Sequence, residues 1–238
     1  MFTVRQRLQR QVHGQYRQKA LPEQRLREGF SLWYTPGMSM DDLEARTQKE
    51  LADIIAVLTE LTGLPSRWSG RVELVPGADF KGKKRFICDI QIEAVLASQK
   101  ARWTTLIHEA LHSFSAGYIR EDYQDFQGWE EGVVENLQRL FRPRVLSRLH
   151  VSVNAQAFGR LDAEHGYNKF VAALEAIREA QGIPVTQAEG FYLDLLATPI
   201  RDRQSHVNRH GFSLPPSQRA GFFSVVSVAS ATLRTRRR

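Results

Sequence analysis

The pentapeptide His108-Glu109-Ala110-Leu111-His112 has residue types and a spacing that can build a metal site. If this segment is helical, His108 and His112 lie one turn apart on the same face, with their Cβ atoms about 5 to 6 Å apart. Two imidazoles in that position can bind one cation at about 2.0 to 2.1 Å. Glu109 is offset around the helix, so we expect it to face a water on the metal. The pattern therefore predicts two ligands and a general base.

A second acidic segment, Trp129-Glu130-Glu131-Gly132, follows at a useful distance. Eighteen residues lie between His112 and Glu131, which is enough for a loop and a helix that runs back past the first. A catalytic zinc ion usually keeps three protein ligands and one open position. This segment is therefore the natural source of a third ligand.

These motifs resemble those of the gluzincin zinc metallopeptidases, the group that includes thermolysin and the aminopeptidase N-like enzymes. The similarity lies in the pentapeptide, the eighteen-residue interval and the tryptophan and glycine around Glu131, which form Trp-x-Glu-Gly here and Trp-x-x-Glu-Gly in the family. It covers residues 103–135, with a looser likeness over 164–200. It implies that Glu131 is the third ligand and that Glu130 is a solvated neighbour. A ligand role for Glu130, one residue earlier, stays open.

Two supporting roles are expected around the ligands. Glu135 stands one helical turn after Glu131, and a metal-bound histidine usually donates its other ring N–H to a carboxylate or carbonyl. Glu135 is thus the expected partner of His108, with a surface charge as the alternative. The resemblance also implies a tyrosine that stabilises the oxyanion, and Tyr167 lies in a matching Tyr-x-Lys setting. Three other side chains stay open for that role: Tyr123, Tyr192 and His165.

Helical periodicity predicts most of the scaffold. Apolar residues recur every three or four positions over 40–62, where Ser39 can cap the start and Gly63 the end. Pro143 is expected to end the second ligand helix. Further helices are expected over 100–116, 129–141, 164–181, 186–197 and 200–210, with a loop over 118–128. The apolar run 222–229 fits either a strand or a buried helix.

Alternating residues predict two strands before the first ligand helix, over 71–75 and 85–92, joined by a basic loop with Lys81, Lys83 and Lys84. Cys88 is expected to be a buried structural thiol. The fold class is therefore α+β: a mainly helical, zincin-like domain with a small N-terminal β-sheet before the active-site helix. The resemblance implies that the strand over 85–92 is the edge strand that pairs with an extended substrate.

Charge divides the 238 residues into three parts. A basic N-terminal arm (1–39, net charge +5) is expected to pack on an acidic catalytic domain. That domain covers 40–215, and a C-terminal segment with a basic tail covers 216–238. The body over 40–200 has a net charge of −5, and 201–238 has +7. Basic ends of this kind can meet nucleic acid or another acidic surface, or be solvated tails.

A cytoplasmic location is the default expectation. The N-terminus lacks the apolar run of a secretory signal, and one cysteine cannot form an internal disulfide. The run over 221–233 is too short for a membrane span, which needs about 20 apolar residues. We therefore expect no membrane partner.

The leading hypothesis is a zinc-dependent peptidase with a peptide or protein substrate. Zn²⁺ would be held by His108, His112 and Glu131, and Glu109 would be the general base. The chain lacks the Gly-x-Met-Glu-Asn segment with which aminopeptidases bind a free amino terminus, so aminopeptidase specificity is not implied. One alternative is a zinc-scaffolded regulatory or nucleic-acid-binding protein that uses its basic terminal arms. Another is a processing protease specific for one partner protein.

Overall fold

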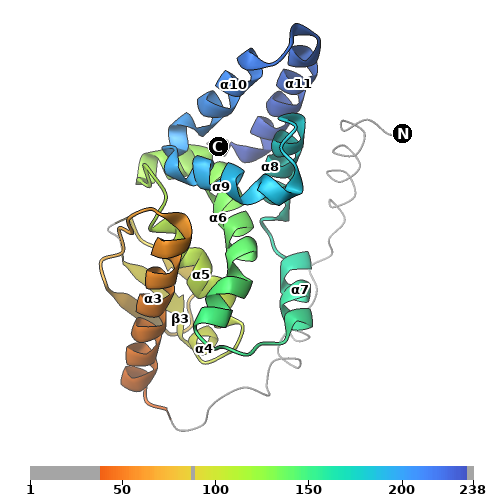
Figure 1. Ribbon diagram of the computed structural model, residues 1–238. Helices are drawn as coiled ribbons and strands as arrows, with labels where there is room; N and C mark the ends of the chain where they lie inside the picture. The colour runs from red at the N-terminus through yellow and green to blue at the C-terminus, as the bar shows by residue number, and fades with distance from the viewer. Residues whose placement is uncertain (1–37, 87–88, 235–238) are drawn as a thin grey trace, which may run out of the picture.

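The computed structural model describes residues 38–86 and 89–234 (Figure 1). Within these ranges the chain is mainly helical, with one small three-stranded sheet, so the α+β class is confirmed. Figure 1 shows α6 (Arg120–Arg148) in the middle of the molecule, between α3 (Met40–Thr62) and the helices that follow it in the chain. The expectations for the N-terminal arm before residue 38, for Cys88 and for the last four residues lie outside the described ranges.

The remaining helices are α4 (Ala94–Ala97), α5 (Arg102–His112), α7 (Ala155–Ala163), α8 (Asn168–Ala180), α9 (Ala188–Ala197), α10 (Arg203–Ser213) and α11 (Pro216–Leu233). Two short 3-10 helices, η2 (Val185–Gln187) and η3 (Ile200–Asp202), precede α9 and α10. The strands are β1 (Val72–Val75), β2 (Gly82–Lys84) and β3 (Ile90–Glu93).

Helix α3 forms where the sequence predicted it. The Ser39 hydroxyl accepts the Asp42 N–H at 3.1 Å, and Gly63 ends the helix with a left-handed φ of 67°. Both devices satisfy backbone groups that a helix end leaves without partners. The apolar stripe of α3, which includes Leu51, Ile54 and Leu58, is fully buried in the common core.

The strand prediction over 85–92 is wrong in its bounds. Strand β3 begins only at Ile90, and Lys83 and Lys84 of the expected loop form β2 instead. Just beyond the ends of the two strands, the Arg85 N–H donates to the Asp89 carbonyl at 2.7 Å. The order is β1-β3-β2, with β3 parallel to β1 and antiparallel to β2. Strand β2, and not β3, is therefore an edge of the sheet.

The prediction for the second ligand helix is also wrong at both ends. Helix α6 begins at Arg120, with a kink at Phe126, and continues through Pro143 to Arg148. Proline inside a helix costs about 3 kcal/mol. Beyond Pro143, Val145 and Leu146 are buried in the core, and each such side chain contributes about 1.5–3 kcal/mol. This burial offsets the proline, so the helix continues.

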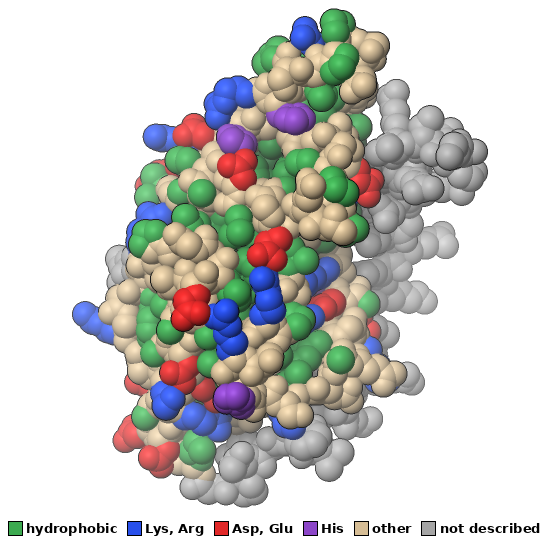
Figure 2. Space-filling view, viewed as in Figure 1, with side chains coloured by type: hydrophobic (Ala, Val, Ile, Leu, Met, Phe, Trp, Pro, Cys, Tyr) green, Lys and Arg blue, Asp and Glu red, His purple; other side chains and the backbone are tan. Residues whose placement is uncertain are grey.

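The C-terminal apolar run is a buried helix, which settles the choice left open by its sequence. Helix α11 packs along α8, and its side chains Phe222, Val226 and Leu233 join the same core as α5 and α6. The α10–α11 pair extends from the body, and apolar side chains lie at its far end (Figure 2). Positive and negative side chains are intermixed over the face seen in Figure 2. Among the described residues, no helix combines the length and apolar character that a membrane crossing requires.

Candidate metal centre

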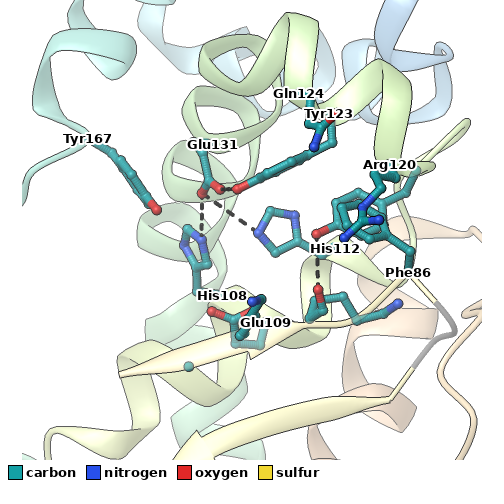
Figure 3. A pocket seen from close by; sticks show the side chains of 13 residues that line it. Phe86, His108, Glu109, His112, Arg120, Tyr123, Gln124, Glu131 and Tyr167 are labelled. Carbon is teal, nitrogen blue, oxygen red and sulfur yellow. Dashed lines mark hydrogen bonds and ion pairs between the residues drawn. The ribbon is translucent and has the colours of Figure 1, made fainter. Parts of the chain in front are cut away.

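Three buried side chains from two helices meet at one point. His108 and His112 come from α5 and Glu131 from α6, and one potential ligand atom of each lies within 4.8 Å of the others. The His108 Nε2 atom is 3.0 Å from Glu131 Oε2, and the His112 Nε2 atom is 3.7 Å from the same oxygen. The three residues expected to be ligands therefore form a cluster that could hold a metal ion (Figure 3).

The distances between the donor atoms can be compared with those of a real coordination sphere. Ligand atoms about 2.0–2.1 Å from a tetrahedral cation lie about 3.3–3.4 Å from one another. The two distances to Glu131 Oε2 lie on either side of this value, so modest side-chain rotation would suffice. Two imidazoles and a carboxylate also form the donor set of many catalytic zinc sites. The residues fit such an ion in chemistry and in spacing.

Glu135 contacts the ring nitrogen of His108 that does not face Glu131. The Nδ1 atom of His108 lies 3.1 Å from Glu135 Oε2, while its Nε2 atom points to Glu131. Glu135 in turn accepts the Arg139 Nε–H at 2.7 Å. Burial alone would lower the pKa of His108, but its hydrogen bonds to Glu131 and Glu135 outweigh burial and raise that pKa well above its ordinary value. The structure thus places Glu135 beside the histidine that it was expected to orient.

The expectation that Glu130 is solvated is wrong. Glu130 is fully buried, and its Oε1 atom lies 2.7 Å from His112 Nδ1. Its Oε2 atom accepts the Ser115 hydroxyl at 2.7 Å and pairs with Arg203 Nη1 at 2.8 Å. Burial opposes ionisation of Glu130, but Arg203, His112 and Ser115 prevail and lower its pKa to about 2. Glu130 therefore faces away from the ligand cluster and orients His112.

Glu109 lies beside the cluster without joining it. Its carboxylate faces the same cavity and accepts the backbone N–H of Lys84 from strand β2. Burial raises the pKa of Glu109, and the nearby histidines oppose that shift only in part. A carboxylate with a raised pKa, next to a cluster that could bind a metal, suits a group that accepts and returns a proton. Its position matches the expected base.

A cavity of about 280 Å³ opens onto the cluster. Strand β2 forms one side through Gly82, Lys83 and Lys84, and the first turn of α6 forms another through Arg120 and Gln124. Figure 3 shows Glu109, His108, His112 and Glu131 around the same space, with tyrosine side chains on either side. A reacting group could therefore approach the three cluster residues and Glu109 together.

Three tyrosines line this cavity. The Tyr123 hydroxyl donates to Glu131 Oε1, the Tyr118 hydroxyl donates to the Lys84 carbonyl at 3.3 Å, and the Tyr167 ring stacks on His108 with centroids 5.8 Å apart. Burial is the largest cause that raises the pKa of each, so all three hold their protons at neutral pH. The single O–H protons of Tyr118 and Tyr123 are given to Lys84 and Glu131, so either tyrosine would have to release that partner to donate to a bound group.

The other two candidates for the oxyanion role lie elsewhere. Tyr192 is buried in α9, and its hydroxyl donates to Glu175. The His165 Nδ1 atom lies 3.7 Å from Glu135 Oε1, on the outer side of the carboxylate that orients His108. Neither lines the cavity, so Tyr167 and Tyr123 are the candidates that the structure brings to the site.

Several contributors to the site were not predicted. Tyr118, Ser115, Arg139 and Arg203 contact the ligand histidines or the glutamates behind them. Ser115 and Arg139 lie close in sequence to the motifs, so helical spacing could have suggested them. Arg203 is far from both motifs along the chain, and no local pattern marks it.

Comparison of the chain with protein-family models, curated proteins and solved structures gives no match.

Proposed function

We propose that this chain is a zinc-dependent peptidase of the gluzincin type, with His108, His112 and Glu131 as ligands and Glu109 as the general base. The proposal is carried by one observation: a buried cluster of two histidines and a glutamate lies beside a carboxylate that shares its cavity but does not belong to the cluster. A structural metal site needs only its ligands. The additional carboxylate and the accessible cavity are features of a catalytic site.

Each group of the site has a separate role in the proposed hydrolysis. Zinc, when bound, would polarise the peptide carbonyl and make water a nucleophile at neutral pH. Glu109 would take the proton of the attacking water and deliver it to the leaving amine. The hydrogen bond from the Lys84 N–H holds the Glu109 carboxylate in place. Tyr167 or Tyr123 would donate a hydrogen bond to the oxygen on which negative charge develops.

Strand β2 offers a backbone surface for the substrate. It lies at an edge of the sheet, and its residues 82–84 line the cavity. An extended peptide can add to an exposed edge through main-chain hydrogen bonds. The corrected sheet order moves this role from the predicted strand over 85–92 to β2. The Lys84 N–H and carbonyl already bond to Glu109 and Tyr118, so the substrate would add at the Gly82 end of the strand. The cavity of about 280 Å³ has room for a few substrate groups near the scissile bond.

The test uses the full chain and measures binding and catalysis separately. The purified protein should contain about one zinc per chain by elemental analysis, and His112→Ala should lose it. Glu109→Gln should keep the zinc but lose hydrolysis of a mixed peptide library by about 10²–10⁴-fold. Equal hydrolysis by wild type and Glu109→Gln would overturn the role of Glu109.

The same experiment separates the alternatives. Zinc binding without hydrolysis of any library peptide would favour a zinc-scaffolded regulatory or nucleic-acid-binding protein, or a processing protease with one partner. Salt-dependent binding of nucleic acid, lost on removal of residues 234–238, would support the former. Cleavage of one protein from a cell extract, lost in Glu109→Gln, would support the latter.

A further inference from the structure

A buried arginine from a distant helix lies behind the candidate metal centre. Arg203, at the start of α10, has no exposed surface. Its Nη1 atom lies 2.8 Å from Glu130 Oε2 and donates to the Trp129 carbonyl at 3.1 Å. Its Nη2 atom donates to the Ser115 hydroxyl at 2.6 Å, and its Nε atom donates to the Thr198 carbonyl at 3.2 Å. All three guanidinium nitrogens therefore have partners.

Burial of the Arg203–Glu130 ion pair costs free energy, so a role other than stability has to be considered for it. Removing a guanidinium and a carboxylate from water costs several kcal/mol per ion, and apolar side chains of similar volume often replace such pairs without loss of stability. Arg203 and Glu130 are both completely buried. Stability alone is therefore a weak reason for this pair, and its second contact, with His112, becomes the important one.

Glu130, the acidic member of the pair, also contacts His112, one of the proposed ligands. The Glu130 oxygen that does not face Arg203 lies 2.7 Å from His112 Nδ1. A carboxylate can only accept there, so a neutral His112 carries its proton on Nδ1 and has an unprotonated Nε2 on the side of Glu131. Nε2 must be unprotonated to bind a metal. The orientation of Glu130 thus selects the ring orientation and tautomer that a metal requires.

We propose that Arg203 is a positioning residue of the metal centre: it fixes Glu130, together with Ser115, so that Glu130 holds His112 ready to bind the ion. The inference rests on the proposed metal site. It makes α10 part of that site, although α10 supplies no ligand. It also explains why Glu130 precedes the ligand Glu131, since adjacent helical residues point in different directions and can serve different partners.

His108 has a parallel arrangement with weaker isolation from water. Glu135 holds its Nδ1 side, and Arg139 from the same helix holds Glu135. The Arg139 side chain is 22% exposed, whereas the Arg203 side chain is 0% exposed. Water can replace part of the hydrogen bonding that Arg139 gives to Glu135, but it cannot reach the fully buried Glu130. Loss of Arg203 should therefore affect the metal site more than loss of Arg139.

The experiment compares Arg203→Met with Arg178→Met. Arg178 is a matched control, because its side chain is only 4% exposed and pairs with Glu175 away from the cavity. The zinc dissociation constant and the tautomer of His112 in metal-depleted protein, seen by ¹⁵N NMR, are the measurements. Arg203→Met should weaken zinc binding about 10–100-fold and mix the two tautomers. Arg203→Lys should recover part of both effects, and Arg178→Met should change neither.

Arg203→Met leaves Glu130 as a buried charge without its partner, and this change could prevent folding. A second variant is therefore included. Glu130→Gln combined with Arg203→Met removes both charges and should fold. It should still weaken zinc binding and mix the His112 tautomers, because the amide of Gln can either accept from or donate to His112 Nδ1, whereas the carboxylate can only accept. An unchanged tautomer and zinc affinity in whichever variant folds would overturn the proposal. Failure of wild type to bind zinc would instead refute the proposed function, while the tautomer measurement still reports on Arg203.

Discussion

Gly82 and Glu109 lie so close together that no side chain fits between them. A Cβ atom on Gly82 would lie 2.8 Å from Glu109 Cγ and 2.4 Å from Thr105 Cγ2. Strand β2 therefore rests directly on helix α5 at the position of the proposed base. The same strand donates the Lys84 N–H to the Glu109 carboxylate. The absence of a side chain at Gly82 is thus a condition for the position of Glu109.

Gly82→Ala should therefore impair catalysis more than metal binding. The new methyl group must push β2 away from α5 or displace Glu109, since Thr105 is β-branched and has little freedom to move. A displacement of about 1 Å can cost about 10²-fold in rate. We expect a fall in kcat of about 10–100-fold with zinc content unchanged. Gly190→Ala is the control, because a Cβ at Gly190 in α9 meets nothing within 4 Å. Full activity of Gly82→Ala would contradict the proposed importance of this contact.

Tyr123 and Tyr167 should separate into different roles when each is changed to Phe. Tyr123 donates to Glu131 Oε1, so its loss should weaken zinc binding by about 10-fold, the lower range for a residue that orients a ligand. Tyr167→Phe should weaken zinc binding less, because its hydrogen bond to Glu131 is the smallest of the causes that raise the pKa of Tyr167. The same change should lower kcat by about 10²–10³-fold if Tyr167 is the oxyanion donor. Zinc titration and steady-state kinetics on both variants make the distinction. A large kcat loss confined to Tyr123→Phe would transfer the oxyanion role to Tyr123.

The parts of this structure that could be predicted depend on local patterns. Helix α3 was predicted with its bounds because its caps and apolar stripe lie within 25 residues of sequence. The cluster of His108, His112 and Glu131 could be predicted because one helical spacing and one interval along the chain relate its members. The buried position of Glu130 could not be predicted, because its partner Arg203 comes from the distant helix α10. Sequence near Glu130 contains no sign of that partner.

The strand and helix errors have the same origin. Alternation over 85–92 is compatible with one long strand, and only the Arg85–Asp89 contact and the pairing of Lys84 with Ile90 show two antiparallel strands. Pro143 is a strong local stop, but the burial of side chains beyond it depends on helices elsewhere in the chain. In both cases tertiary contacts outweigh a local preference.

Two glycines of α6 should differ in how well they tolerate alanine. A Cβ on Gly128 would lie 2.7 Å from both Cα and O of Leu233, which are backbone atoms of α11. A Cβ on Gly132 would meet Leu174 Cδ1, the end of a side chain, at 2.7 Å, and the nearest backbone atom, Phe170 O, only at 3.2 Å. Alanine alone favours a helix by about 1 kcal/mol over glycine. Gly128→Ala should nevertheless lower the free energy of unfolding by about 1–3 kcal/mol, and Gly132→Ala by less. Urea denaturation checks the order, and the reverse order would contradict the close packing of α6 on α11.

The rim of the cavity predicts a preference for acidic substrates. Lys83 and Arg120 are exposed on its two sides, whereas Glu109 and Glu131 are buried at its base. Cations at the mouth attract negative groups, and the attraction falls as salt screens it over a Debye length of about 10 Å at 0.1 M. Peptides with Asp or Glu near the scissile bond should therefore have higher kcat/KM than matched peptides with Lys, by about 3–30-fold at low salt. Lys83→Glu combined with Arg120→Glu should reverse the order, whereas Lys49→Glu, on α3, should not. Equal kcat/KM for acidic and basic peptides at low salt would show that these two cations do not select the substrate.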